Sequence, residues 1–439
     1  MSRSRCNRRD SFYLMKKIAI VEGVRTPFIK SWGLFDRLPA QWLGAKCVRE
    51  LLERTRFAPN LVDEVIFGCV AQPAEAANVA RVISLESGIP KEKEACTVNR
   101  NCASGFEAVT SAAEKILCGV DEVVVAGGTE SMSNASMLFR KDASALFRRL
   151  SRAKNFLEKV KILLCFRPKH FSPVSSLKLG LTDPTCGLNM GETAEILAKE
   201  FKISRERQDA FALRSHERAV QAREKLREEI IPVFLPNNPE AGIQDDNGPR
   251  EHQTLNTLSK LKPVFDRGHG TVTAGNSSQI TDGACALLLM DAEKAKAMGY
   301  EILGILRDYT YVGVEPSHMG LGPVFAIEKL LRKNSLTLKD IGLIEINEAF
   351  AAQVLACLEA LASPEFFRDH FQAGAPAGEI DPEILNVNGG AIALGHPVGT
   401  SGARLILTCL KEMKRRSVRR GLVSLCVGGG QGGAVLLER

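Results

Sequence analysis

The sequence lacks several features that would have assigned the chain to a class at once. No apolar run approaches the roughly 20 residues needed to cross a bilayer, so we expect no transmembrane helix. The twelve cysteines are scattered, with no C-x-x-C pair and no dense spacing. This usage indicates a reducing compartment and no metal site, with most of the cysteines acting as small buried apolar residues.

An excess of positive charge is also absent from most of the chain. The net charge is +7, yet residues 139–171 hold ten Lys or Arg against two acidic residues, which leaves about −1 for everything else. A general nucleic-acid-binding surface is therefore excluded, and the one basic segment needs its own explanation.

The chain starts with a short arginine-rich stretch. Residues 1–14, MSRSRCNRRDSFYL, hold four arginines and one acid, the composition of a mitochondrial leader, but they are few and lack an amphipathic pattern. Met15 resembles a natural start. We predict that residues 1–14 are an extension outside the fold, and that the protein is cytoplasmic, with a mitochondrial location as the alternative.

Two sets of alternating strand and helix patterns make up most of the sequence. The first set runs through strands 16–23, 62–70, 94–100 and 122–128, with helices 40–53, 78–86 and 105–117 between them. The second set has helices 326–332, 349–361 and 400–414 and strands 341–347, 384–390 and 421–430. This alternation predicts an α/β sheet with mostly parallel pairing, built from two similar halves.

A less regular region separates the two sets. Residues 131–272 contain the basic segment, a predicted helix pair (191–200 and 204–225) and a Pro/Asn/Asp-rich stretch. We predict an N-terminal half formed by 15–130 and 273–295, an inserted loop domain over 131–272, and a C-terminal half over 296–439.

The first chemical motif is "VNRNCASGFEAV". Cys102 comes just before a helix that Ser104 and Gly105 begin, so free backbone N–H groups point near its sulfur and are expected to lower the pKa of the thiol. A thiol activated in this way is a nucleophile. A cysteine packed ahead of a helix has the same local pattern.

Two glycine-rich motifs follow in the second half. In "GGAIALGHPVGTSG", His396 lies between Gly395 and Pro397, on a constrained turn that suits approach to a ligand, although a structural histidine fits it too. In "SLCVGGGQGG", Cys426 ends an apolar strand, and the backbone N–H of Gly428 can point at an oxyanion. A glycine turn with no catalytic role has the same sequence pattern.

A fourth motif, "EINEAFAAQ", follows another buried strand. Asn347 is placed to hold a water or an oxygen, and Phe350 to contact an apolar substrate. The competing interpretation is that Asn347 caps a helix.

Taken together and in this order, the Cys, Asn, Gly-His-Pro and Cys-x-Gly motifs resemble the thiolase family from about Met15 to Arg439. The resemblance implies a duplicated α/β/α/β/α layered fold with an inserted loop domain. It also implies that Cys102 is the acyl-accepting nucleophile, His396 the base, and Cys426 the acid/base. Asn347 would hold an oxyanion-site water, and Gly428 would supply a backbone oxyanion donor.

The resemblance extends to substrate contacts. Ser278 in "TVTAGNSSQITDGA" matches a position that hydrogen-bonds pantetheine, and Met190 and Met319 match methionines that line the acyl pocket. Asn189 occupies a position at which short-chain biosynthetic members of the family tend to have histidine. This difference favours the degradative branch.

The implied reaction is thiolytic cleavage of 3-ketoacyl-CoA in fatty-acid β-oxidation, with coenzyme A as a substrate and no bound cofactor or metal. The alternatives are an acetyl-CoA C-acetyltransferase acting on acetoacetyl-CoA, and a non-catalytic interaction subunit, against which the intact motifs argue. The resemblance also implies an assembly of at least two copies, as a homodimer or a homotetramer.

The basic segment has a pattern of its own. Within 144–165, apolar residues recur at steps of four and three (Leu146, Leu150, Ala153, Leu157, Val160, Leu164), and cations flank them. That spacing predicts a helix that contacts a membrane surface or a partner, although a helix packed on the loop domain shows the same stripe. The segment resembles the extended loop of thiolase β-subunits that work with a separate α-subunit.

Overall fold

The structure is a computed structural model that describes residues 16–236, 238–372 and 375–439. The predicted extension, residues 1–14, lies outside the described residues. Across the described ranges, no helix is both long and apolar enough to cross a membrane.

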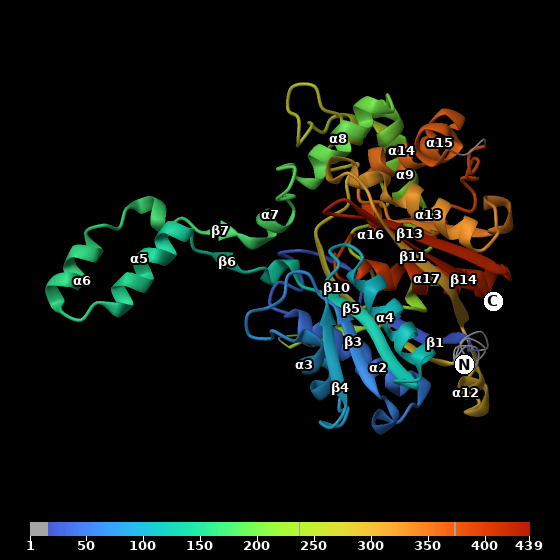
Figure 1. The fold of residues 1–439 in the computed structure, drawn as a ribbon, viewed down its shortest axis with the longest axis horizontal. Helices are drawn as coiled ribbons and strands as arrows, with labels where there is room; N and C mark the ends of the chain where they lie inside the picture. Colours follow the sequence, from blue (N-terminus) through green and yellow to red (C-terminus); the bar gives the residue numbers. More distant parts are fainter. Residues whose placement is uncertain (1–15, 237, 373–374) are drawn as a thin grey trace, which may run out of the picture.

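One large mixed sheet runs through both halves of the chain (Figure 1). Its order is β12-β13-β14-β11-β1-β10-β5-β3-β4, with β2 paired to β10. The strands are β1 (Ile18–Arg25), β2 (Ile29–Lys30), β3 (Glu64–Gly68), β4 (Glu94–Val98), β5 (Val123–Glu130), β10 (Thr281–Asp291), β11 (Gly304–Gly313), β12 (Leu343–Ile346), β13 (Arg420–Val427) and β14 (Gln431–Glu438). The pairing of β1 with β11 joins the two halves.

The expectation of mostly parallel pairing is wrong for the middle of the sheet. Among the strands of the described residues, only β3 with β4, β3 with β5, and β12 with β13 are parallel. In contrast, β1, β10, β11 and β14 pair antiparallel with their neighbours. The sequence pattern missed β11 and β14. β14 follows β13 through the tight turn of Gly428–Gly430, and a hairpin connection of this length makes the two strands antiparallel.

Helices form three layers around the sheet, as the family resemblance implied. The outer layer of the first half is α2 (Ala40–Thr55) and α3 (Val79–Glu86), and the outer layer of the second half is α13 (Gly322–Lys333) and α14 (Ala351–Ala362). Between the two halves of the sheet lie α4 (Ser104–Cys118) and α17 (Ser401–Arg416), whose apolar residues share one buried cluster with strands of both halves.

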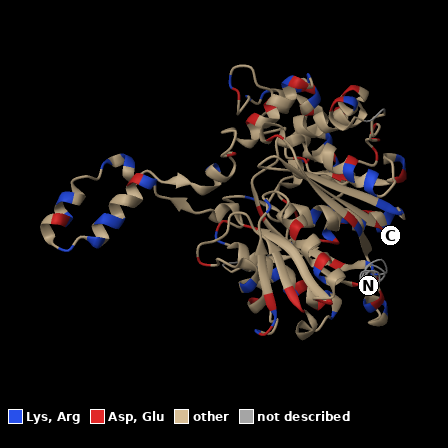
Figure 2. Cartoon of the chain, viewed as in Figure 1, with Lys and Arg blue, Asp and Glu red and all other residues tan. Residues whose placement is uncertain are grey.

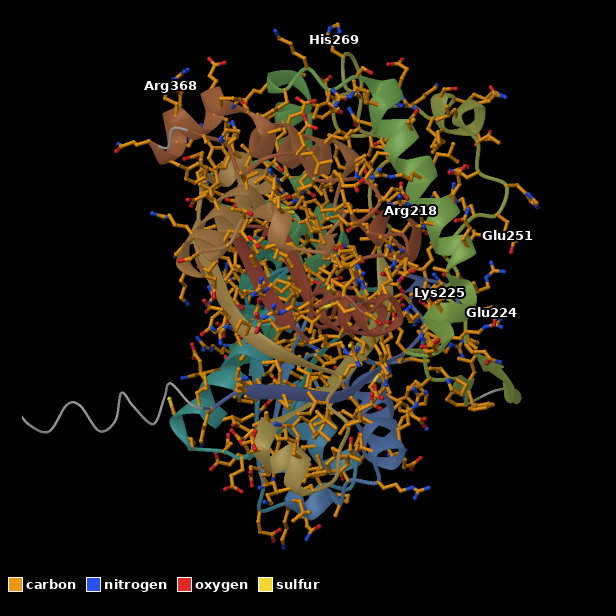
Figure 3. All side chains as sticks on the ribbon, turned by 90° about the vertical axis from the view of Figure 1, so that its right-hand side faces the viewer. Arg218, Glu224, Lys225, Glu251, His269 and Arg368 are labelled. Atoms are coloured by element: carbon orange, nitrogen blue, oxygen red, sulfur yellow. The ribbon has the colours of Figure 1, made fainter. Side chains whose placement is uncertain are left out.

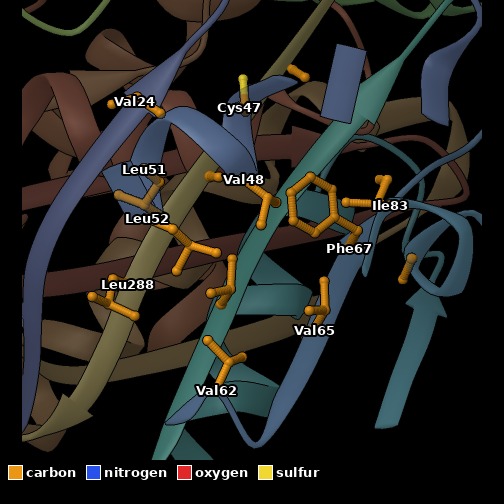
Figure 4. Close-up of a cluster of buried hydrophobic side chains, with 14 of the residues drawn as sticks. Val24, Cys47, Val48, Leu51, Leu52, Val62, Val65, Phe67, Ile83 and Leu288 are labelled. Atoms are coloured by element: carbon orange, nitrogen blue, oxygen red, sulfur yellow. The ribbon is translucent and has the colours of Figure 1, made fainter. Parts of the chain in front are cut away.

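The outer core of the first half shows why these segments become helix and strand. In α2, the buried positions Cys47, Val48, Leu51 and Leu52 fall at helical spacing, and they pack on Phe67 and other strand residues (Figure 4). The β-branched residues of β3 and β5 are buried on both faces of the sheet, because helices cover both sides.

The two central helices approach each other unusually closely at their N-termini. A Cβ atom on Gly105 would lie 2.7 Å from the backbone nitrogen of Ala403, and one on Gly402 would lie 2.4 Å from that of Phe106. Only glycine leaves room for this crossing. The Ser-Gly pairs that recur in the two halves therefore lie against each other, and they bring the motifs of Cys102 and His396 to one region.

The inserted region is attached to the second half by helices. Its helical elements are α8 (Met190–Glu200), α9 (Arg205–Gln221), α10 (Arg223–Arg227) and α11 (Leu255–Ser259), with a small β8 (Val233–Leu235) and β9 (Asn238–Ile243) hairpin. The predicted single helix over 204–225 is interrupted at Ala222. Arg218 of α9 donates to the carbonyl oxygen of Leu385 at 2.6 Å, on the side of the molecule seen in Figure 3.

The basic segment forms an arm that projects from the body (Figure 1). The arm comprises residues 137–175. Its base is a two-stranded ribbon of β6 (Met137–Leu138) and β7 (Val174–Ser175), and its tip is a hairpin of α5 (Lys141–Arg152) and α6 (Phe156–Leu163). Its cations lie on both helices (Figure 2). The single helix predicted through 144–165 is wrong, because extended backbone at Ala153 ends α5 and Asn155 caps α6.

The remaining helices are short: α7 (Ser176–Gly180) follows the arm, α12 (Ala292–Ala297) follows β10, and α15 (Pro364–Phe371) and α16 (Ala391–Leu394) lie in the second half. The strand predicted over 384–390 is wrong, since only an isolated bridge from Leu385 to Ile344 forms there. The glycines and Asn386, which has φ +47, turn the chain away from the sheet.

Candidate active site

Cys102 lies in a tight turn between β4 and α4. Asn101 adopts a left-handed conformation with φ +46, and the Ser104 hydroxyl accepts the N–H of Arg100 at 2.9 Å and donates to the Asn101 carbonyl at 2.7 Å. These bonds hold the cysteine at the N-terminus of α4, as the sequence predicted.

The electrostatics of Cys102 differ from the sequence expectation. Burial raises the pKa of its thiol, although hydrogen bonding from the backbone N–H groups of Gly428 and of Cys102 itself opposes the rise. Burial has the larger effect on this pKa. Removing a thiolate from water costs more free energy than hydrogen bonds from a few backbone N–H groups restore. The cysteine is therefore a neutral thiol that already has two N–H donors beside it.

Cys426 and Gly428 come from the end of β13 and the turn after it. The Asn101 side-chain amide donates to the Gly428 carbonyl at 2.7 Å, which ties this turn to the Cys102 turn. Cys426 is 1% exposed. Burial raises the pKa of its thiol well above the usual range, and the neighbouring Cys102 adds to the rise. A thiol that stays protonated can donate a proton to a carbanion.

His396 lies on the turn between α16 and α17. Gly395 before it has φ +104, and its hypothetical Cβ would lie 2.3 Å from the Thr281 side chain, so the turn requires glycine. The His396 Nδ1 atom is 2.6 Å from the Ser401 hydroxyl, and its Nε2 atom is 3.5 Å from the Asn347 amide nitrogen. Burial, with a contribution from Arg404, lowers the pKa of His396 to about 4, so its imidazole is neutral near pH 7.

Asn347 follows β12 and is fully buried. It is not a helix cap, because α14 begins at Ala351 and Phe350 occupies the capping position. Its backbone N–H donates to the Ser424 carbonyl at 2.9 Å, and its Oδ1 atom has no hydrogen-bond partner among the described residues. A buried amide with a free acceptor beside His396 suits a water or a substrate oxygen.

A cavity of about 790 Å³ opens at Cys102. Gly428 and Met190 line it near the thiol, and it extends to the base of the arm and to α7. The larger apolar side chains of this lining include Val70, Met132, Leu138, Leu177, Leu179, Leu181, Met190 and Val398. Its volume lies in the usual range for ligand sites.

The other predicted contact residues gather around Cys426. Met319 and Phe350 pack with Cys426 in one buried cluster, and Met190 packs against it. Ser278 is half-buried, and its N–H donates to the Ala349 carbonyl at 2.9 Å. The structure thus brings the predicted site residues to one region, from both halves and the inserted region.

Asn189 has a structural explanation here. Its side chain accepts the N–H groups of Gly191 and Glu192 and so caps α8, while the Glu192 carboxylate accepts the N–H of Asn189 in return. The residue therefore fixes the start of the helix that carries Met190.

Sequence reasoning missed three residues of this site. Ser401 contacts His396, and Asn101 contacts Gly428. Glu130 lines the cavity, and its buried carboxylate accepts N–H groups from Val70, Ala71 and Gly399. Glu130 could have been noticed as an acid at the end of an apolar strand, and Asn101 and Ser401 as polar neighbours within the quoted motifs.

Comparison with known proteins gives matches over nearly the whole chain. The family model for the thiolase N-terminal domain matches residues 18–293, and the one for the thiolase C-terminal domain matches residues 300–439. A 3-ketoacyl-CoA thiolase of Pseudoalteromonas translucida is 42% identical over 96% of this chain and 97% of its own length. One of Aeromonas salmonicida is 41% identical over the same shares.

Solved structures agree with these matches. The acetyl-CoA acetyltransferase of Bacillus anthracis has a TM-score of 0.84 and 36% identity, covering 97% of this chain and 99% of that one. Human mitochondrial 3-ketoacyl-CoA thiolase in complex with CoA has a TM-score of 0.82 and 36% identity, covering 97% and 98%.

Proposed function

Since the chain belongs to the thiolase family, we propose that Cys102, His396 and Cys426 carry out its reaction, the CoA-dependent cleavage of a 3-ketoacyl-CoA. The products are acetyl-CoA and an acyl-CoA shortened by two carbons. The observation that carries the assignment is the cavity that opens at Cys102, beside the Gly428 turn and the buried Cys426.

In the first half-reaction, His396 takes the proton of the Cys102 thiol, and the sulfur attacks the 3-keto carbon. The carbon–carbon bond then breaks, which leaves an acyl thioester on Cys102 and the enolate of acetyl-CoA. Cys426 gives its proton to that enolate carbon, and acetyl-CoA leaves. The raised pKa of the Cys426 thiol suits this step, because the group is protonated when the carbanion forms.

In the second half-reaction, the thiol of free CoA gives up its proton and attacks the acyl thioester. The acyl group moves to CoA, and the Cys102 sulfur departs and is reprotonated. Before this step the His396 imidazolium passes the proton that it took from Cys102 to the Cys426 thiolate, which restores both groups. The neutral His396 then accepts the CoA proton and returns it to the departing Cys102 sulfur. CoA is thus a substrate, and the steps use only groups of the chain and of CoA.

Negative charge develops on an oxygen in each half-reaction. The backbone N–H groups of Cys102 and Gly428 already act on the sulfur position, and they support one oxyanion site. His396, with a water held by Asn347, is proposed as a second, and the Oδ1 atom of Asn347 beside His396, which has no partner among the described residues, supports it. A donor fixed in advance contributes about 3 kcal/mol to such a transition state.

We test this function by measuring thiolysis of 3-ketoacyl-CoA substrates from four to sixteen carbons. Cys102→Ala is expected to abolish turnover and the acyl-enzyme mass adduct, whereas Cys118→Ala, an exposed cysteine at the other end of α4, keeps both. Full activity in Cys102→Ala would overturn the assignment.

The acyl chain of the substrate is proposed to be medium or long. The cavity continues past Cys102 along an apolar lining to Leu138 and Leu177, which supports a chain longer than four carbons. Leu177→Trp should then lower kcat/KM for the sixteen-carbon substrate at least tenfold and leave the four-carbon substrate nearly unchanged. Lys178→Trp adds the same indole to α7 outside the cavity lining and is the matched control.

Two alternatives have distinct signatures. An acetyl-CoA C-acetyltransferase, the activity of the Bacillus anthracis protein, would act on acetoacetyl-CoA alone. A non-catalytic subunit would show no turnover with any chain length, although the catalytic motifs are intact in this chain.

We further propose that the arm contacts an anionic membrane surface. Phe156, Leu157 and Leu164 are 78%, 73% and 80% exposed on it, and cations lie beside them on both helices. Exposed apolar side chains flanked by Lys and Arg suit the headgroup region of a bilayer.

Vesicles of phosphatidylglycerol and phosphatidylcholine test this contact by co-sedimentation. Replacing both Leu157 and Leu164 by Ser should abolish binding, and Val120→Ser, an equally exposed apolar residue of the body, should not. Binding of the Leu157/Leu164 variant at the wild-type level, or binding only to a separate α-subunit of an oxidation complex, would reject the membrane proposal.

The assembly and location are also proposals. The edge strand β4 pairs only with β3 among the described strands, and its residues are half-exposed, which supports association of at least two copies through that edge. The bacterial relatives support a cytoplasmic protein over a mitochondrial one.

A further inference from the structure

The hydrogen bonds of Ser401 determine where His396 carries its proton. The Ser401 hydroxyl oxygen lies 2.6 Å from His396 Nδ1 and 3.1 Å from the carbonyl oxygen of Pro397. Ser401 is fully buried, and His396 is 8% exposed, so water does not compete strongly for these bonds.

Only one arrangement makes both of these contacts hydrogen bonds at once. The hydroxyl has a single hydrogen, and the Pro397 carbonyl can only accept. The hydroxyl therefore donates to Pro397, the backbone four residues earlier, as a serine in the first turn of a helix readily does. It is then left to accept from His396, so the Nδ1 atom must carry the hydrogen.

The other ring nitrogen gives independent support. The Asn347 amide nitrogen, which is a donor, lies 3.5 Å from Nε2. A donor at this position matches an Nε2 atom that has a free lone pair. The neighbours on both sides of the ring thus agree on the same tautomer, with hydrogen on Nδ1 and none on Nε2.

We propose that Ser401 is a positioning residue that holds His396 in the Nδ1–H tautomer and so presents the Nε2 lone pair as the base for the Cys102 and CoA thiols. This inference rests on the proposed function, because it assigns a role to a residue that touches neither substrate nor sulfur. It explains why the neutral imidazole of His396 has its basic lone pair on Nε2, the nitrogen that must accept the thiol proton.

The choice of a hydroxyl rather than a carboxylate has a further consequence. A carboxylate partner would stabilise the imidazolium, whereas a hydroxyl accepts the Nδ1–H without adding negative charge. The fixed charge of Arg404 acts on the ring in the same direction. His396 therefore holds a proton briefly and returns it, as a group that serves two thiols in turn must do.

The test uses the full chain with 15N-labelled histidine, because the two ring nitrogens give different NMR shifts in the two tautomers. The His396 signal is assigned by its loss in His396→Asn. Wild-type protein should show Nδ1 protonated and Nε2 unprotonated at pH 7. A wild-type signal with the proton on Nε2 would overturn the proposal.

Variants give the kinetic half of the test. Ser401→Ala should lower kcat of thiolysis about 10- to 100-fold with KM little changed, as loss of a histidine-orienting partner does, and it should shift the tautomer signal. Ser401→Thr keeps the hydroxyl and should recover most of the rate. Ser87→Ala is the matched control, since Ser87 is a buried serine whose hydroxyl also donates to a carbonyl four residues earlier, at 2.7 Å, far from the motifs.

An unchanged rate and tautomer in Ser401→Ala would reject the role, and so would equal losses in Ser401→Ala and Ser87→Ala. The NMR measurement requires no turnover. Inactivity of the wild-type protein toward every 3-ketoacyl-CoA would therefore overturn the proposed function, while the tautomer signal would still decide the role of Ser401.

Discussion

The resting protein holds His396 as a neutral imidazole and Cys102 as a neutral thiol. Burial is the largest cause for both groups: it lowers the pKa of His396 to about 4 and raises the pKa of Cys102. A preformed thiolate–imidazolium pair is therefore not the ground state. In the proposed mechanism, the reactive thiolate forms only when substrate and oxyanion donors can share its charge, and a neutral resting thiol is less open to oxidation.

The pH dependence of thiolysis follows from this state at the residue scale. Because the pKa of His396 lies near 4 rather than 6.5, kcat/KM should not fall until the pH drops below about 5, where the imidazole becomes protonated and cannot accept a thiol proton. The measurement is kcat/KM between pH 4 and 8, with circular dichroism at each pH as a control for unfolding. An acid limb centred at pH 6 to 7 in folded protein would contradict the prediction.

At the scale of elements, one buried charge cluster attaches the inserted region to β1. Arg25 of β1 is fully buried, and its guanidinium contacts Glu229 at 2.6 Å and Asp246 at 2.7 and 2.8 Å. Asp246 also accepts the N–H of Phe28 at 2.7 Å. The cluster satisfies a charge that the sheet would otherwise bury alone.

Removing one partner of this cluster should be costly. Asp246→Ala is expected to lower the free energy of unfolding by about 3–5 kcal/mol, because the Arg25 charge stays buried with fewer partners. Urea denaturation followed by fluorescence measures the change. Glu293→Ala removes the carboxylate of an exposed pair with Lys296 and should leave the midpoint unchanged; similar shifts for the two variants would contradict the argument.

The arm, at the same scale, has a small core separate from the body. Phe147 lies 4.9 Å from Phe139 and from Phe166, and 6.5 Å from Phe171, between ring centroids. These contacts lie within the arm and hold α5 against the segment that follows α6, residues 166–171.

Phe147→Ala should loosen the arm alone. We expect faster trypsin cleavage within 140–169, where the cations are dense, and no change in the main thermal transition of the body. Phe156→Ala, at a ring that is 78% exposed, should change neither. A lower transition temperature for the whole protein in Phe147→Ala would mean that the arm core supports the body.

At the scale of the whole molecule, the site exists because the two halves cross at their central helices. The N-termini of α4 and α17 touch through Gly105 and Gly402, and the buried cluster around them takes strands from both halves. Cys102 precedes one of these helices, and His396 precedes the other. The two halves are thus packed on each other beside the candidate site residues.

A methyl group at this crossing should disturb both halves together. In Gly402→Ala the new Cβ would start 2.4 Å from the Phe106 nitrogen, so the backbones must separate, and we expect loss of thiolysis together with a lower midpoint of unfolding. Gly313→Ala is the matched control, because nothing lies within 4 Å of its Cβ position. Normal activity in Gly402→Ala would show that the crossing can relax without moving the catalytic groups.

The sequence by itself determined the local features of this protein. Ser104 and Ser401 begin helices where the pattern predicted, the layered fold follows from the alternation and the family motifs, and the candidate residues lie in one region. These features depend on neighbours a few residues apart. The direction of the central strands, the break of the arm into two helices, the neutral states of Cys102 and His396, and the proton position that Ser401 selects were decided only by the tertiary structure. Each of them depends on strand pairing, burial or a hydrogen bond formed after distant segments meet, and no short window of sequence carries that information.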